Sequence, residues 1–151
     1  MNDKLIAAKT RKDQKAKTSA AIDILRTFIL ANNYQSAESF VTSFKKGLPE
    51  SANNNDWARW YYYLGRLEAI KGTGLDTYKK ALKNFELALR KAPQNGAVGF
   101  KQEVNKWIVL VKLLVGEIPE RSLYRVKELE QVLHPYLQLT QGFFLLINLN
   151  L

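Results

Sequence analysis

The sequence predicts an all-α chain in which helical hairpins stack into a solenoid. Apolar residues recur at helical spacing along nearly the whole chain, and alternating, strand-like runs are almost absent. Clusters of Gly, Pro and Asn divide this pattern into short segments, as loops between helices do. With 151 residues, 46% of them hydrophobic, the chain is long enough for one modest domain.

Helix-breaking residues set the expected boundaries of six helices. The predicted helices span residues 19–31, 35–46, 56–71, 75–91, 97–115 and 126–141. Asn32-Asn33 ends the first helix, and Gly47 followed by Pro49 ends the second, which is the usual order of these residues at a helix C-terminus. Asp56 is the expected N-cap of the third, because its carboxylate accepts hydrogen bonds from the free amides of the first turn.

The later boundaries follow the same logic. The segment 72–74, Gly-Thr-Gly, separates the third helix from the fourth, and Ala92 before Pro93 ends the fourth because a residue before proline avoids the helical region. The segment 116–119, Gly-Glu-Ile-Pro, ends the fifth helix. His134-Pro135 predicts a kink or an early stop in the sixth.

Two degenerate tetratricopeptide (TPR) repeats fit this pattern. The TPR template pairs two antiparallel helices in about 34 residues, with small residues where the helices approach and a proline after the second helix. Anchoring the template at Pro93 places Ala81, Phe85 and Ala88 at its small, aromatic and alanine positions, and Leu64-Gly65 fits the first helix after a short insertion. Anchoring it at Pro49 gives a second, looser match. The repeats occupy residues 18–51 and about 58–95, so each hairpin should bury its apolar stripe against its neighbours rather than in a central core.

The predicted domain organisation has three parts. Residues 1–17 form a basic N-terminal segment or inter-helix linker, with six Lys or Arg against two Asp, a net +4. Residues 18–141 form the TPR-like domain, and 142–151 form a divergent apolar tail. The net charge of +9 favours an acidic protein, nucleic acid or an anionic surface as partner. The longest apolar runs fall far short of the ~20 residues that a membrane span needs.

Four stretches resemble one known family. They are ANNNDWARWYYYLGRLEAI at 52–70, ALRKAPQNGAVGFKQ at 88–102, LVGEIPER at 114–121 and PYLQLTQ at 135–141. These segments resemble the family of non-ATPase regulatory subunit 3 of the 26S proteasome, lid subunits that carry a PCI module. The resemblance covers about residues 5–141. It implies helical repeats that continue upstream and a winged helix downstream, which the residues after Gln141 are too few to form, so we expect a fragment or a truncated paralogue.

The resemblance also implies function. Members of this family are non-catalytic scaffolds that bind other lid subunits, including a small acidic disordered one, and support ubiquitin-dependent protein degradation in the cytoplasm and nucleus. The residues themselves agree with a non-catalytic role, since the chain has no Cys and a single His, His134, beside a proline. The Gly72/Gly74 pair lacks the third glycine and preceding strand of a nucleotide-binding loop. We therefore predict no enzyme activity, catalytic residue, cofactor, metal site or membrane contact.

The repeat register points to one candidate binding surface. Four positions of the first helix of each TPR repeat line the concave groove. The first repeat places Ser19, Ile22, Arg26 and Ile29 there, and the second places Arg59, Tyr62, Arg66 and Ala69. Arginine suits carboxylate recognition because its planar fork donates two parallel hydrogen bonds. Arg26, Arg59, Tyr62 and Arg66 are therefore the candidate site for an acidic chain, and an ordinary solvated helix face is the alternative.

A second function remains open at this point. A free-standing basic adaptor that binds RNA or acidic peptides would also be rich in Lys and Arg. Aromatic residues between basic ones, as in the segment 57–63, can stack on bases. Helical geometry favours packing instead, with Trp57, Trp60, Leu64 and Leu67 on the inner stripe and Tyr63 beside it, so nucleic acid is the less favoured partner.

Overall fold

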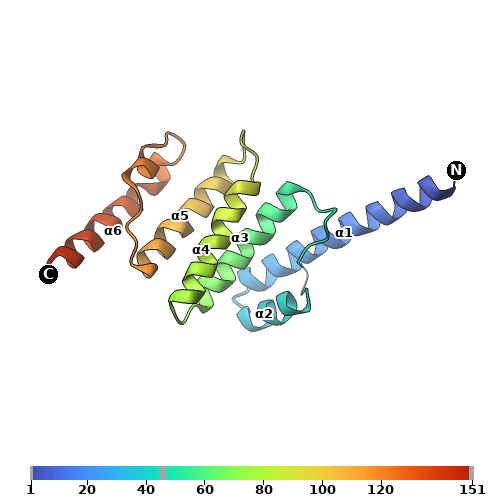
Figure 1. The fold of residues 1–151 in the computed structure, drawn as a ribbon, viewed down its shortest axis with the longest axis horizontal. Helices are drawn as coiled ribbons and strands as arrows, with labels where there is room; N and C mark the ends of the chain where they lie inside the picture. Colours follow the sequence, from blue (N-terminus) through green and yellow to red (C-terminus); the bar gives the residue numbers. More distant parts are fainter. Residues whose placement is uncertain (1, 45–46, 150–151) are drawn as a thin grey trace.

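The computed structural model describes residues 2–44 and 47–149, and their side chains except those of residues 2–9 and 11. These residues form helices and loops and no strand, which confirms the predicted all-α class. The helices are α1 (Asn2–Leu30), α2 (Tyr34–Ser43), α3 (Asn54–Lys71), α4 (Leu75–Lys91), α5 (Val98–Val115), the short 3-10 helix η1 (Arg121–Arg125) and α6 (Glu130–Leu149). They lie side by side along the longest axis of the molecule, with the two termini at opposite ends (Figure 1).

The core is divided among three clusters rather than gathered at one centre. The first cluster joins α1, α2 and α3 through buried Ile22 and Leu25 of α1, Ala37 of α2, and Trp60 and Leu67 of α3. The second joins α3, α4 and α5 through Ala69, Phe85 and Ile108. The third joins α5, η1 and α6 through Val109, Tyr124 and Leu133. Each helix therefore buries its apolar stripe against its neighbours in the stack, as the TPR-like solenoid predicts.

The second repeat is built around a close approach between α3 and α4. Gly65 of α3 lies against the fully buried ring of Phe85 in α4, and a Cβ at this glycine would lie 2.8 Å from Phe85 Cε1. Ala81 and Ala88 of α4 are also fully buried. The small and aromatic residues that matched the TPR template thus occupy the positions where that template needs them.

Helix α1 is longer than predicted. It begins at Asn2, well before Ser19, and its N-terminal part projects beyond the stack (Figure 1). The side chains of Lys12–Lys17 are exposed, and Ala16 is the one apolar residue among these six, so periodicity detects no apolar stripe there. The segment lacks Gly and Pro and is rich in Ala and Lys, which have high helix propensity.

Helix α3 begins two residues earlier than predicted, and Asp56 is not its N-cap. Asn53 is the cap, and its side-chain oxygen accepts from the backbone N–H of Asp56 at 2.8 Å. The Asp56 carboxylate accepts in return from the N–H of Asn53 at 3.4 Å. This capping box satisfies two free amides at once, whereas a cap at Asp56 would satisfy one. The prediction missed it because Asn53 was assigned to a loop.

The other boundaries of the first five helices lie close to the predictions. Helix α2 ends at Ser43, and the predicted end at Lys46 lies outside the described residues. Helix α4 matches its predicted range, and Ala92 is extended before Pro93 as expected. Gly116 adopts a left-handed φ of 87°, and the following amide of Glu117 donates to the Lys112 carbonyl at 2.8 Å, which ends α5.

Helix α6 differs from the prediction at both ends. It begins at Glu130 rather than Val126, because residues 121–125 form η1 and a turn follows. Pro135 lies inside the helix without stopping it, so the predicted early stop is wrong. Pro135 is the sixth residue of α6, beyond the first turn, so the helix continues past it without the hydrogen bond that an amide there would donate to the Gln131 carbonyl. The residues from Gly142 to Leu149, predicted as a divergent tail, continue the same helix with most side chains exposed.

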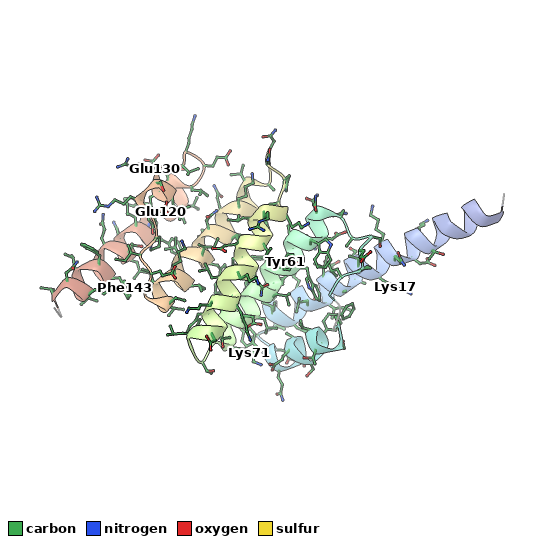
Figure 2. The ribbon with its side chains drawn as sticks, in the orientation of Figure 1. Lys17, Tyr61, Lys71, Glu120, Glu130 and Phe143 are labelled. Atoms are coloured by element: carbon green, nitrogen blue, oxygen red, sulfur yellow. The ribbon has the colours of Figure 1, made fainter. Side chains whose placement is uncertain are left out.

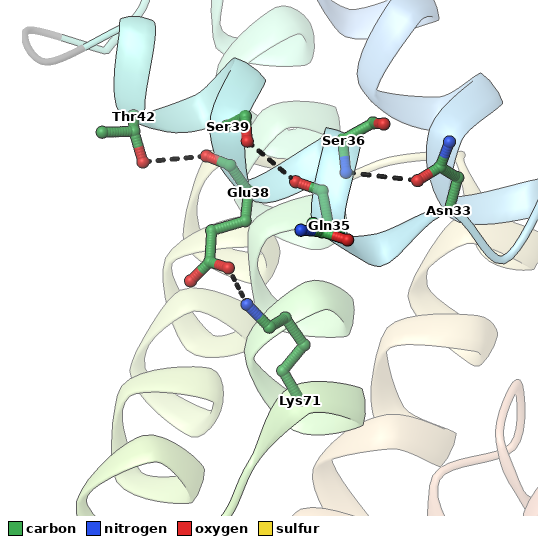
Figure 3. A network of polar contacts seen from close by, with 7 residues as sticks. All are labelled: Asn33, Gln35, Ser36, Glu38, Ser39, Thr42 and Lys71. Carbon is green, nitrogen blue, oxygen red and sulfur yellow. Dashed lines mark hydrogen bonds and ion pairs between the residues drawn. The ribbon is translucent and has the colours of Figure 1, made fainter.

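Polar contacts connect α2 to its neighbours (Figure 3). Asn33 caps α2 by accepting from the N–H of Ser36 at 3.2 Å. Ser39 and Thr42 donate to carbonyls one turn back, of Gln35 and Glu38. The Glu38 carboxylate pairs with the ammonium of Lys71 at the end of α3. This pair joins α2 to α3.

Candidate partner-binding site

The candidate site lies where α1, α3 and α5 run next to one another. Arg59, Tyr62 and Arg66 occupy successive turns of α3, and all three are half-buried. Because seven residues are nearly two turns of an α-helix, Arg59 and Arg66 lie on the same face of α3. Arg26 lies on α1 and is exposed. The four residues predicted from the repeat register therefore come from adjacent helices, but their surroundings differ.

Arg59 is directed toward α1. Its Nη2 donates to Asp23 Oδ1 at 2.9 Å, and both side chains are substantially exposed, at 38% and 57%. An exposed ion pair of this kind contributes about 0–1 kcal/mol. The charge of Arg59 is thus offset by a neighbouring carboxylate, which makes it a weaker anchor for an acidic chain than the sequence indicated.

Arg66 is directed toward α5. Its Cζ lies 5.7 Å from the ring centroid of Tyr62, one turn back on α3, and 5.5 Å from the centroid of Trp107 on α5. Two aromatic faces at this distance attract a guanidinium by cation–π interaction, and they restrict the rotamers of its long side chain. Arg66 Nε is buried and has no hydrogen-bond partner among the described residues. The structure thus holds Arg66 in place without a carboxylate partner in the described part of the chain.

Tyr62 lies between this arginine and the second cluster. Its ring contacts those of Phe85 and Phe100 at centroid distances of 6.2 and 5.5 Å. Burial raises the pKa of the Tyr62 phenol, and the nearby charge of Arg66 opposes that rise. Tyr62 is therefore a neutral, mostly apolar wall of the site.

One further ion pair borders the site on α5. Glu103 Oε1 accepts from Lys106 Nζ at 2.6 Å, and this hydrogen bond raises the pKa of Lys106. The carboxylate of Glu103 is thereby engaged on its own helix. Among the described cations at the site, Arg59 and Lys106 are paired with carboxylates, and Arg66 and Arg26 are not.

Three of the predicted groove positions are closed. Ile22 and Ile29 are 0% and 1% exposed because they form the first cluster with α2 and α3, so they cannot contact a ligand. Ala69 is also buried, against the second cluster. The repeat register therefore predicted too many ligand-contacting positions, because the first repeat has isoleucine at two positions where an open groove would have polar residues. Ser19 is exposed.

The repeat register also missed a central residue of the site. Trp107 belongs to α5, which has no assigned repeat in the sequence, so no register placed it beside Arg66. Its ring stacks on Phe85 at a centroid distance of 5.9 Å and an interplanar angle of 20°. The sequence does place Glu103, Trp107 and Leu110 at helical spacing, and this spacing could have indicated that Trp107 shares a face of the fifth helix with them.

The described residues contain neither a group of metal-ligating side chains nor a candidate membrane-spanning helix. Within 2–44 and 47–149, no group of three or more His, Asp or Glu side chains is placed to hold a metal ion. None of the helices in that part of the chain combines the length and apolar character needed to cross a membrane. His134 is exposed on α6, with Nε2 3.4 Å from the side-chain nitrogen of Gln138.

Comparison with known proteins decides the family. A family model described as "PSMD3-like, N-terminal TPR repeats" matches residues 1–140. The chain belongs to this family. This PSMD3-like chain is 42% identical over 142 residues to the 26S proteasome non-ATPase regulatory subunit 3 of Caenorhabditis elegans, across 94% of the chain and 27% of that relative. It is 43% identical to the probable subunit 3 of Drosophila melanogaster, across 94% of the chain and 28% of the relative.

The similarity extends to fungi. The probable 26S proteasome regulatory subunit rpn3 of Schizosaccharomyces pombe is 40% identical over 136 residues, which cover 89% of the chain and 26% of that protein. The PSMD3-like chain thus spans about a quarter of the length of the curated relatives that it matches. These matches confirm the resemblance inferred from the segments near residues 52–70 and 88–121.

Proposed function

We propose that this chain is a non-catalytic structural component of the proteasome regulatory particle, within its lid, and that it supports ubiquitin-dependent protein degradation in the cytoplasm and nucleus. The observation that carries the proposal is the PSMD3-like match over residues 1–140. The relatives are named as non-ATPase regulatory subunits, which supports a binding role rather than a reaction.

Helix α6 provides a surface for binding a neighbouring subunit. Six large apolar side chains, each between 39% and 80% exposed, gather on its second half. They are Leu139, Phe144, Leu145, Leu146, Ile147 and Leu149. This part of α6 lies at one end of the stack, near labelled Phe143 (Figure 2). Stacked helical hairpins bury such faces against a further helix, so we place a helix of another lid subunit here.

The surface around the four candidate residues is the second proposed binding surface. We propose that an acidic disordered lid subunit lies along Arg26, Arg59, Tyr62 and Arg66. Residues 56–116 carry eleven Lys or Arg against five Asp or Glu, so the net charge of this region is +6. A net positive charge of this kind accelerates the approach of an acidic chain, and its effect falls as salt is added.

Co-sedimentation tests the proposed function. The tagged 151-residue chain is expressed in animal cells, separated on a glycerol gradient and analysed by mass spectrometry. We expect a fraction to sediment with identified regulatory-particle subunits. Leu146→Lys with Leu149→Lys should move it to the free pool. Leu30→Lys is the matched control, because Leu30 is also exposed, at 58%, but lies at the end of α1. Sedimentation of the wild-type chain only as a free species would reject the proposal.

The basic N-terminal part of α1 supports the alternative of an RNA-binding adaptor. Lys12, Lys15 and Lys17 are exposed on the segment that projects from the stack (Figures 1 and 2). Such an adaptor would bind oligonucleotides with strong salt dependence, because each neutralised phosphate releases counterions. Failure to bind a single-stranded oligonucleotide at low ionic strength would eliminate this alternative.

A further inference from the structure

Helix α6 carries a second apolar stripe on the side that faces away from the stack. Its inner side contacts α5 and η1 through Leu133, which belongs to the third cluster, and through Thr140, whose hydroxyl lies 2.8 Å from that of Tyr124. The outer stripe consists of Val132, Pro135, Leu139, Gly142, Leu146 and Leu149. Val132 is half-buried and the other five residues are exposed. Helix α6 lies at one end of the stack and contacts only α5 and η1 among the described helices (Figure 1), so the outer stripe is uncovered.

The spacing of the outer stripe is typical of a helix that packs lengthwise on another helix. Its members follow one another at alternating intervals of three and four residues, which are the a and d positions of a coiled-coil seam. The flanking e and g positions usually carry the charges that select a partner. Here they are all uncharged, namely Gln131, Tyr136, Gln138, Phe143 and Leu145. The outer stripe therefore suits an apolar helix and offers no ion pair to a charged one.

The outer stripe is nearly symmetrical about Gly142. Pro135 and Leu149 lie at equal distances along the chain on either side of it, and Leu139 and Leu146 differ by one residue. An antiparallel copy of α6 that crosses at Gly142 would therefore set Leu139 against the copy's Leu146 and Pro135 against the copy's Leu149. A two-fold axis would repeat each contact. No atom lies within 4 Å of a Cβ added at Gly142, so the crossing point is open and the two helix axes can approach closely.

We infer that two copies of this chain associate through an antiparallel pair of α6 helices, related by a two-fold axis at Gly142, and that this pairing competes with the binding of another lid subunit. The competition rests on the proposed function, because that function places a lid helix on the same exposed residues of α6. A free chain would then bury its apolar face against a second copy until a subunit of the regulatory particle replaces that copy.

The distribution of charge favours a second copy at this face. The chain has a net charge of +9, so two copies repel each other across most of their surface. Residues 131–149 contain no Lys, Arg, Asp or Glu, so two α6 helices can approach along this segment without a like-charge contact. An acidic chain or a nucleic acid would find no cation in the outer stripe to pair with. Self-association through α6 is thus compatible with a strongly basic chain.

The area of the face predicts a weak dimer. Leu139, Leu145, Leu146 and Leu149 are 50–80% exposed. Each of these side chains then offers on the order of 100 Å² of apolar surface. With the flanking residues, burial would reach about 500 Å² per copy and about 1,000 Å² for the pair, which is the lower limit of specific interfaces. We therefore expect a dimer that forms at micromolar concentration rather than a permanent one.

Sedimentation equilibrium of the full chain tests the association. Between about 1 and about 200 μM, the mean mass should rise from 17.3 kDa toward twice that value. Leu146→Lys should weaken the association at least tenfold, because the two-fold axis places each buried charge in the interface twice. Leu30→Lys on α1 is the matched control, since Leu30 and Leu146 are 58% and 62% exposed, and circular dichroism verifies the fold of both variants. A monomer at every concentration would overturn the inference.

Salt separates apolar pairing from pairing by charge. Added salt should strengthen the dimer, because it screens the repulsion between two chains of net charge +9. Weaker association at higher salt would mean that opposite charges hold the copies together, which would contradict the proposed interface.

A single engineered thiol tests the geometry. The chain has no Cys, so Gly142→Cys provides one thiol at the proposed axis, where the two copies come close enough for a disulfide. Glu130→Cys is the control on the same helix: it lies about 18 Å from the axis, so its two copies would be about 36 Å apart. Under mild oxidation Gly142→Cys should become a covalent dimer and Glu130→Cys should not. Equal cross-linking of both variants, or the reverse preference, would refute the antiparallel arrangement.

The locked dimer separates this inference from the proposed function. Oxidised Gly142→Cys added to a cell extract should not sediment with regulatory-particle subunits, whereas the reduced variant should. If both forms sediment with the particle, the competition is refuted and the proposed function stands. If the wild-type chain dimerises but never joins the particle, the proposed function fails and the self-association through α6 stands.

Discussion

Gly65→Ala is the substitution whose effect follows most directly from the packing of α3 on α4. The new Cβ would lie 2.8, 2.9 and 3.0 Å from three ring atoms of Phe85. The ring cannot easily yield, because it is fully buried and stacks on Trp107 at 5.9 Å while also contacting Tyr62 at 6.2 Å. Overpacking of a filled core costs about 1–3 kcal/mol, whereas alanine gains up to about 1 kcal/mol over glycine in a helix. We expect a net destabilisation of about 1 kcal/mol.

A double-mutant cycle isolates the clash from helix propensity. Phe85→Leu removes the distal ring atoms and is itself destabilising, but it makes room for the new methyl group. In that background Gly65→Ala should be neutral or stabilising, which corresponds to a coupling free energy of about 1–2 kcal/mol. Gly142→Ala is the matched control, because Gly142 lies inside α6 with no atom within 4 Å of the added Cβ, and it should stabilise the chain.

Urea unfolding followed by tryptophan fluorescence measures these changes. The three tryptophans lie at 57, 60 and 107, in the helices that flank Gly65, so the signal reports on the affected region. Midpoints and slopes are compared, because stacked repeats need not unfold in a single step. If Gly65→Ala stabilises the wild-type chain as much as Gly142→Ala does, the argument from close helix approach is refuted.

Three further outcomes are expected. Asn53→Ala should lower the free energy of unfolding in the urea assay by about 1 kcal/mol, because it removes the N-cap of α3. Asn55→Ala is the control at an exposed neighbouring position and should change that free energy by less than about 0.5 kcal/mol. Burial raises the pKa of the Tyr62 and Tyr124 phenols above their usual 10.0, so the free energy of unfolding should fall as pH rises above about 10. Urea midpoints measured across alkaline pH should show this fall, and it should be smaller in Tyr62→Phe. Arg59→Gln should change stability by under about 1 kcal/mol, because its ion pair is exposed, and a larger loss would show that the pair is structural.

Sequence patterns predicted the central helices well because those helices are amphipathic. Helix α4 has buried Ala81, Phe85 and Ala88 on one face, and Gly74 and Pro93 flank its ends. The apolar period and the helix-breaking residues therefore predict the same boundaries. The helix over residues 12–17 was missed for the opposite reason, since its side chains are all exposed and leave no apolar stripe in the sequence. The start of α3 depended on choosing between Asn53 and Asp56, two good capping residues one turn apart, and only their reciprocal hydrogen bonds decide it.

The candidate site was predicted in part. Repeat register correctly placed Arg59, Tyr62 and Arg66 on one face of α3, because that inference needs only the helical period. It did not foresee that Asp23 would pair with Arg59 or that Trp107 would contact Arg66. Those contacts depend on how far α1 and α5 tilt and slide against α3, which local sequence does not encode.

The division of the core into three clusters has a mechanical consequence. Helices α3 and α5 each contribute side chains to two clusters, so they are the joints through which one end of the molecule is coupled to the other. A force applied at one end would therefore be transmitted through α3 and α5, and the outermost helices, which pack on one side only, would unfold first. Amide protons should accordingly exchange slowest in the middle of the stack and fastest toward both ends.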